Sequence, residues 1–224
     1  MTSDAAAATF PTDWTRALVL VAHPDDPEYG MSAAVARWTQ EGRTVEYVLG
    51  SSGEAGIEGM PADTCGPLRE AEQRRAAAAV GVEQVDFLGF PDSRLADTDE
   101  LRSALTEVID ARRPEVVLGI FSGAEWAPGS PNQSDHIEFG RAVAAAVRQA
   151  RVRPLLFENG GAVTHVVEVD PGHVERAVRS LAEHREYLRV FDPDTPVQEQ
   201  AEHQIEAVLG DPPRVGFALV DAAG

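Results

Sequence analysis

The stretch LVLVAHPDDPEYG, residues 18–30, predicts a buried strand that ends directly in a cluster of polar residues. The continuous apolar run at 17–22 is typical of a strand covered on both faces, as in a parallel sheet. His23 ends this run, and three acidic residues follow it within five positions. Such a loop either caps the next helix or carries chemistry at the mouth of the strand.

Strand and helix patterns alternate along the rest of the chain. Apolar runs predict strands at 17–22, 44–50, 85–90, 115–121, 154–158, 164–170 and 216–220. Amphipathic segments predict helices at 29–40, 67–80 (with Pro67 at its start), 97–113, 134–150, 172–191 and 197–209. This alternation indicates an α/β fold with a mostly parallel sheet and helices on both faces. We expect one domain over 1–224, with residues 1–14 as a loose N-terminal tail.

Ligands of such folds bind at the carboxyl ends of the strands, near the point where the strand order reverses. The loops after the first four predicted strands should therefore share one rim. These loops hold most of the chemistry-bearing residue types, at 23–28, 51–59, 90–94 and 123–136.

Composition excludes several classes of function. The net charge is −18, so nucleic acid and anionic membranes are poor partners. All 19 basic residues are arginine, which excludes Schiff-base lysines and the lysine of phosphate-binding loops. No apolar run is long enough for a membrane span, and Cys65 is the single cysteine. From the composition of residues 1–14 we expect no secretory signal. We therefore expect a cytoplasmic protein.

His23 and Asp26 have a spacing that lets both side chains meet at one ion, and His136 at the start of a later helix offers a third ligand. Two histidines and a carboxylate leave open positions, as a catalytic zinc site needs, and the same set also holds Fe(II). Asp25, beside the ligands, would then be the base for a water molecule. The alternative is a polar loop that only caps a helix.

Four motifs in order resemble the N-acetylglucosaminyl deacetylase family, also called PIG-L or LmbE-like. They are AHPDD after the first strand, SSGEAG at 51–56, the segment REAEQRRAAAAVGVEQVDFLGFPD at 69–92, and SDHIEFGRAV at 134–143. The resemblance covers about residues 17–145.

This resemblance implies a three-layer α/β/α Rossmann-like fold and zinc-dependent removal of the N-acyl group of an amino sugar. By position, it implies that His23, Asp26 and His136 are the metal ligands and that Asp25 is the general base. Arg69 and Asp92 match positions near the sugar-binding rim.

Two departures from the family pattern affect the implied roles. Pro27 follows Asp26, so the next acid is delayed to Glu28, which we interpret as an acid of the first helical turn. Gln133 stands where many members carry a histidine that donates a proton. A glutamine amide donates a hydrogen bond to an oxyanion but delivers no proton. Asp25 would then serve as both base and acid, or another group supplies the proton.

The sequence therefore predicts a metal-dependent N-deacetylase of a small N-acyl amino sugar or glycoconjugate, with Gln133 also at the substrate. Two alternatives stay open: an amidase for a thiol conjugate or an antibiotic intermediate, and a non-catalytic binding protein on the same fold. A homo-oligomer is also left open. Of the remaining histidines, His184 lies near where the family often has a late histidine, and a surface or hydrogen-bonded role is expected for it.

Overall fold

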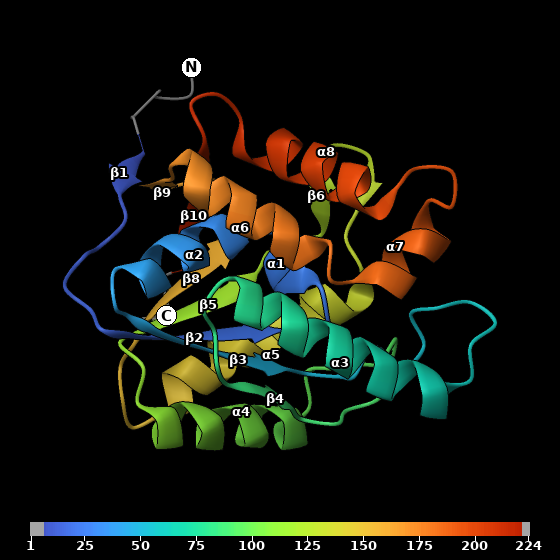
Figure 1. Cartoon of the computed structure of the whole chain (residues 1–224). Helices are drawn as coiled ribbons and strands as arrows, with labels where there is room; N and C mark the ends of the chain where they lie inside the picture. The colour runs from blue at the N-terminus through green and yellow to red at the C-terminus, as the bar shows by residue number, and fades with distance from the viewer. Residues whose placement is uncertain (1–6, 221–224) are drawn as a thin grey trace.

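A computed structural model of the chain describes residues 7–220 and contains one large sheet between layers of helices (Figure 1). Eight strands form this sheet in the order β1-β9-β10-β8-β5-β2-β3-β4. Their bounds in that order are Ala8–Thr9, His165–Glu168, Arg214–Val220, Leu155–Asn159, Val116–Ile120, Arg16–Val21, Thr44–Leu49 and Val85–Phe87. Only β10 runs antiparallel to its neighbours, β8 and β9. The predicted mostly parallel sheet is confirmed.

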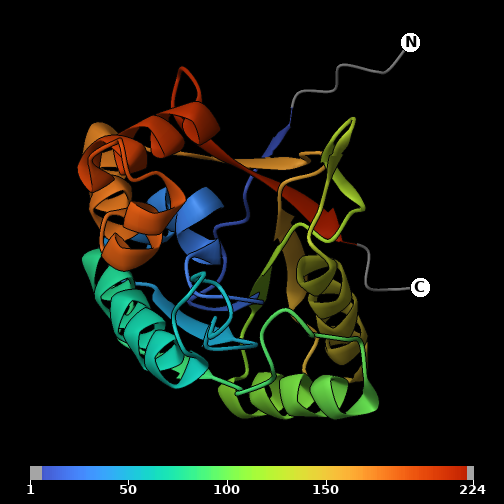
Figure 2. The same ribbon diagram turned by 90° about the vertical axis from the view of Figure 1, so that its right-hand side faces the viewer.

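Helices cover both faces of the sheet (Figures 1 and 2). One face carries α4 (Asp99–Arg112) and α5 (Ser134–Gln149). The other carries α1 (Asp26–Gly30), α2 (Ser32–Gln40), α3 (Ala62–Ala79), α6 (Pro171–Leu181), α7 (Arg185–Phe191) and α8 (Val197–Leu209). The three-layer α/β/α fold is therefore confirmed. Within residues 7–220, none of the helices has the length and apolarity to cross a membrane.

The central strand β2 shows why the two faces need separate cores. Val19 and Val21 pack under α2 and α6, whereas Leu18 and Leu20 pack under α4 and α5. All four side chains are at most 1% exposed. Alternate residues of a strand point to opposite faces, so a strand buried on both sides has the continuous apolar run seen in the sequence.

Several sequence predictions about the elements are corrected. The tail expected at 1–14 is wrong for the described part, because β1 pairs with β9 and both Phe10 and Trp14 are buried against Trp38. Residues 1–6 lie outside the described residues. Helix α3 begins at Ala62, with Pro67 inside it rather than at its start.

The single helix expected at 172–191 is two helices that meet near His184. A short two-stranded hairpin, β6 (Glu125–Ala127) and β7 (Ser130–Pro131), was also not predicted. Its proline and glycine gave the appearance of a simple loop.

The topology places the loop after β2 at the centre of one sheet edge. Strand β2 lies between β3 and β5, and the chain reaches them in opposite directions across the sheet. The order of strands therefore reverses beside β2, where ligands of open α/β sheets bind.

Candidate metal and active site

The loop after β2 is held in a compact turn by its own residues. The backbone N–H of His23 donates to Oδ2 of Asp26 at 2.8 Å. Asp25, between them, has a left-handed backbone with φ of 82°, a conformation that costs free energy for a residue other than glycine. All three side chains are buried. This turn places the Asp25 and Asp26 carboxylates at the same cavity.

His136 joins this loop from the first turn of α5. Its Nε2 lies 3.1 Å from Oδ1 of Asp26 and 3.3 Å from Nδ1 of His23. Its Nδ1 lies 3.2 Å from the side-chain oxygen of Asn132, which can only accept a hydrogen bond. The proton of a neutral His136 ring is therefore held at Nδ1, and the lone pair of Nε2 faces Asp26 and His23.

His23 is oriented in the same way by two further carboxylates. Its Nε2 lies 3.1 Å from Oδ2 of Asp135 and 3.2 Å from Oδ1 of Asp92. Burial alone would lower the pKa of His23, but the hydrogen bonds to Asp135 and Asp92 and the charge of Asp26 raise it to about 10. The carboxylates around this imidazole thus favour positive charge at the site.

The donor set fits a divalent cation. Nδ1 of His23 and Nε2 of His136 face each other, while each ring directs its other nitrogen to an acceptor. Ligand atoms of His23, Asp26 and His136 all lie within 4.8 Å of one another and are buried. A carboxylate that accepts the second nitrogen of a histidine is the usual outer partner of a metal-binding imidazole. Asp92 and Asp135 occupy that position here.

Arg69 reaches the loop from α3 and contacts Asp25. Its Nη2 donates to Oδ2 of Asp25 at 3.1 Å and to the carbonyl of Pro24 at 2.8 Å. Burial raises the pKa of Asp25 to about 6, and the positive charge of Arg69 limits this rise. Among residues 7–220, the structure shows no hydrogen bond to the other carboxylate oxygen, Oδ1. Arg69 therefore fixes one oxygen of Asp25 and leaves the second available.

The glycines of the SSGEAG motif make room for this arginine. A Cβ atom on Gly53 would lie 2.3 Å from Nη1 of Arg69, and one on Gly56 would lie 2.2 Å from it. Gly53 also has a positive φ of 64° and accepts a hydrogen bond from Arg69 on its carbonyl. The motif is thus explained by packing against the guanidinium that holds Asp25.

A second buried group supports Asp25 from the other side. The side-chain oxygen of Gln73 accepts the N–H of Asp25, and its NH2 group donates to Glu28. Glu28 also receives hydrogen bonds from Ser180 and His184, at 3.3 Å and 3.2 Å. Glu28 lies in the first turn of α1 as predicted, but it is fully buried at 0% exposure. It connects the loop after β2 to α3 and to the junction of α6 and α7.

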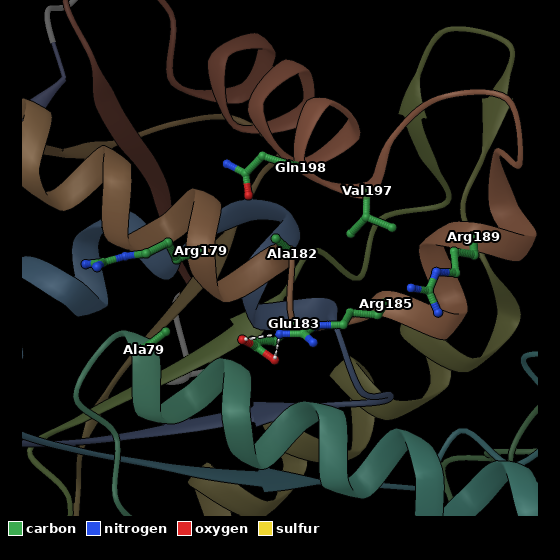
Figure 3. A pocket seen from close by; sticks show the side chains of 8 residues that line it. All are labelled: Ala79, Arg179, Ala182, Glu183, Arg185, Arg189, Val197 and Gln198. Carbon is green, nitrogen blue, oxygen red and sulfur yellow. Dashed lines mark hydrogen bonds and ion pairs between the residues drawn. The ribbon is translucent and has the colours of Figure 1, made fainter.

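A cavity of about 540 Å³ opens over the loop after β2. Asp25, Asp26, His136 and Gln133 line it, and Trp126 of the β6–β7 hairpin lies at its edge with its ring centroid 6.0 Å from that of His136. A groove of similar volume lies between α3, α6, α7 and α8 (Figure 3). There Arg185 is paired with Glu183, and the lining holds no histidine or aspartate. Of these two cavities, only the first is lined by site residues predicted from the sequence.

The structure thus brings most of the predicted site residues to one place. His23, Asp26 and His136 converge, Asp25 lies beside them, and Gln133 lines the cavity. Their catalytic and ligand roles stay predictions. Asp92 turns toward the ring of His23.

The proximity of Arg69 to the sugar-binding rim stays a prediction, and the structure shows which groups its side chain contacts. The residue is 3% exposed and is absent from the cavity lining. It bonds to the backbone of the loops and to Asp25 instead. Its position indicates that it orients Asp25.

Sequence reasoning missed Asp135, Asn132 and Gln73 as parts of the site. Asp135 directly precedes His136, and this Asp-His pair was the one available signal. Asn132 and Gln73 carry no spacing pattern, because their roles depend on contacts between distant segments.

Residues 18–147 match the sequence profile of the family described as PIG-L, GlcNAc-PI de-N-acetylase. This chain belongs to the PIG-L family. The matched region includes every site residue predicted from the sequence. It ends before α6, α7 and α8, so the helices that supply Ser180 and His184 to this PIG-L protein lie outside the match.

Curated relatives agree with this assignment. The chain is 28% identical to a probable N-acetyl-alpha-D-glucosaminyl L-malate deacetylase 2 of Bacillus anthracis, over 72% of this chain and 73% of the relative. It is 34% identical to a 1D-myo-inositol 2-acetamido-2-deoxy-alpha-D-glucopyranoside deacetylase of Mycobacteroides abscessus, over 61% of this PIG-L protein and 57% of that relative.

The fold is similar to that of N,N'-diacetylchitobiose deacetylase from Pyrococcus horikoshii, with a TM-score of 0.76 and 18% identity. That match covers 94% of this chain and 85% of the other. At this level of identity the likeness supports the shared fold of this PIG-L protein and no more.

Proposed function

We propose that this protein is a metal-dependent N-deacetylase that hydrolyses the acetamide of an N-acetylated amino sugar. The observation that carries the proposal is the convergence of His23, Asp26 and His136, with Asp25 beside them at one cavity. The curated relatives are named as deacetylases of N-acetylglucosamine derivatives, which supports the same reaction here.

His23, Asp26 and His136 would hold the cation, with Zn2+ as the expected ion and Fe2+ as the alternative. When bound, such an ion polarises the amide carbonyl and lowers the pKa of water at the site. Asp92 and Asp135 keep His23 in the orientation that the ion requires.

Asp25 is the proposed proton carrier. Its Oδ1 accepts a proton from the water molecule whose oxygen attacks the amide carbon. The C–N bond then breaks, and the same proton passes from Asp25 to the departing nitrogen, which leaves a free amine and acetic acid that ionises to acetate. Arg69 and Gln73 hold the Asp25 side chain and backbone in place during both transfers.

Gln133 is the proposed hydrogen-bond donor at the carbonyl oxygen. It lines the cavity with His136, and its amide NH2 group can stabilise developing negative charge. Because glutamine supplies no proton, we assign both the base and the acid role to Asp25 in this proposal.

The test is the release of acetate from a panel of N-acetylated amino sugars by purified protein of measured metal content. We expect about one metal ion per chain, acetate formation, and loss of both after treatment with a strong chelator. Readdition of Zn2+ should restore the reaction. A protein that binds no metal under replete conditions would contradict the proposal.

A further inference from the structure

The cavity above the proposed catalytic residues has an apolar mouth. Large apolar side chains that are exposed to solvent gather there, at Trp126, Val163, Phe191 and Val208, which are 45%, 46%, 70% and 42% exposed. They come from the β6–β7 hairpin, the segment between β8 and β9, the end of α7, and α8. Single exposed apolar residues are normal, but several around one opening indicate a binding surface.

This mouth is continuous with the proposed reaction site. The same cavity wall includes Asp25, Asp26 and His136, and the rings of Tyr29 and Tyr187 also line it. A volume of about 540 Å³ lies within the range of about 300–1,000 Å³ that is usual for small-molecule sites. An acetyl group extends only one methyl group beyond the carbonyl carbon of the scissile amide bond. The rest of this space is therefore available to the sugar and to a substituent on the sugar.

The charges of the cavity lining restrict which chemical group the amino sugar can carry as a substituent. Among the described lining residues, the ionisable ones are Asp25, Asp26, His136 and the two tyrosines, and none of the chain's arginines is present. The neutral polar lining consists of Gln133, Asn159 and Gln204. Apart from the proposed metal ion, a carboxylate or phosphate on the substrate would meet no arginine among these lining residues, and it would share the cavity with the carboxylates of Asp25 and Asp26.

We propose that the mouth of this cavity is a subsite for an uncharged apolar group attached to the amino sugar, such as an aryl or alkyl aglycone. This rests on the proposed deacetylase function and adds the class of substrate. The relative from Bacillus anthracis is named for a malate conjugate, which carries two carboxylates. The chain described here should discriminate against such a substituent.

Steady-state acetate release tests the subsite with three N-acetyl-alpha-D-glucosaminides, namely the phenyl glycoside, the methyl glycoside and the malate conjugate. We expect kcat/KM to fall in that order, with the phenyl glycoside ahead of the methyl glycoside by about tenfold or more. A higher kcat/KM for the malate conjugate than for the phenyl glycoside would overturn the inference.

Phe191 and its neighbour Val190 provide a matched pair of variants. Both are exposed residues of α7, but only Phe191 lines the cavity, and Val190 is 52% exposed. Phe191→Ser should lower the ratio of phenyl to methyl kcat/KM by about threefold or more. Val190→Ser should leave that ratio unchanged, and an equal fall in both variants would overturn the inference.

A binding measurement separates the subsite from the reaction. Titration calorimetry with phenyl glucoside, which has no acetamide, should show saturable binding that Phe191→Ser weakens and Val190→Ser does not. If no glycoside releases acetate, the proposed function fails, and this titration alone then supports or overturns the subsite.

Light scattering of the wild type and both variants tests whether a second copy of the chain covers the same surface. An unchanged mass for all three supports the substrate subsite. A wild-type dimer that only Phe191→Ser dissociates would make the mouth a self-association surface and overturn the inference.

Discussion

The side-chain oxygen of Gln73 accepts a 2.7 Å hydrogen bond from the backbone N–H of Asp25. The same amide donates through its NH2 group to Glu28, so one buried side chain joins the strained residue to a buried carboxylate. Gln73, Glu28, Ser180 and His184 all have exposures of 0%. The left-handed backbone of Asp25 therefore persists because the surrounding groups determine it.

Gln73→Met should remove both hydrogen bonds while keeping most of the side-chain volume. Leaving buried polar groups without a partner costs about 1–3 kcal/mol, so the free energy of unfolding should fall by that amount. Misplacement of Asp25 should lower kcat by about tenfold or more, with a smaller change in KM. Urea unfolding and steady-state kinetics measure both effects.

The exposed Gln149 at the end of α5 provides the control, as Gln149→Met removes an amide that is far from this network. Equal kcat values for Gln73→Met and the wild type would show that Gln73 does not position Asp25.

Asp25 and Asp26 are neighbours with different proposed roles, and their amide variants should separate those roles. Asp25→Asn should retain the metal and lose about 10²- to 10⁴-fold in kcat, the usual range for general acid–base catalysis. Asp26→Asn should lower the metal content itself, because Asp26 faces both histidines. Metal analysis and acetate release are measured on the same samples. Asp63→Asn, at an exposed position of α3, serves as the control, and full activity of Asp25→Asn would contradict the mechanism.

Asp135→Asn tests the orientation of His23. Asp135 accepts from Nε2 of His23, and its loss should weaken metal affinity by about 10- to 100-fold. Asp92 contacts the same nitrogen, so the site should still bind metal to a measurable extent. Competition with a chromophoric chelator gives the affinity. If Asp135→Asn and the exposed control Asp63→Asn bind metal equally well, Asp135 has no such role.

The strand and loop at the centre of the site could be predicted because their signals are local. A strand buried on both faces needs a continuous apolar run, and Val19 and Leu20 show the two cores that impose it. The parallel topology then brings the loops after neighbouring strands to one edge. His136 joined the predicted set because it follows another strand of the same sheet.

The supporting network could not be predicted because its partners are distant in sequence. Ser180 and His184 lie more than 150 positions from Glu28, and no periodic pattern links them. An acid in the first turn of a short helix has the same pattern whether it faces solvent or the interior. The break between α6 and α7 has the same origin, because His184 turns inward to Glu28.

An ion pair at the start of α4, between Asp97 and Arg102, gives a pH-dependent stability that is independent of the proposed metal site. Nε and Nη2 of Arg102 donate to Oδ1 and Oδ2 of Asp97, each at 2.6 Å. This hydrogen bonding lowers the pKa of Asp97 from 3.8. A carboxyl group whose pKa is lower in the folded state than in the unfolded state stabilises the fold at pH values above the unfolded pKa. That stabilisation is lost as the pH falls through the folded pKa. Asp97→Asn should therefore lower the free energy of unfolding at pH 7, and its difference from the wild type should shrink steadily below about pH 4. Urea unfolding at a series of pH values measures this difference, and one that stayed constant from pH 7 to pH 3 would contradict the assignment.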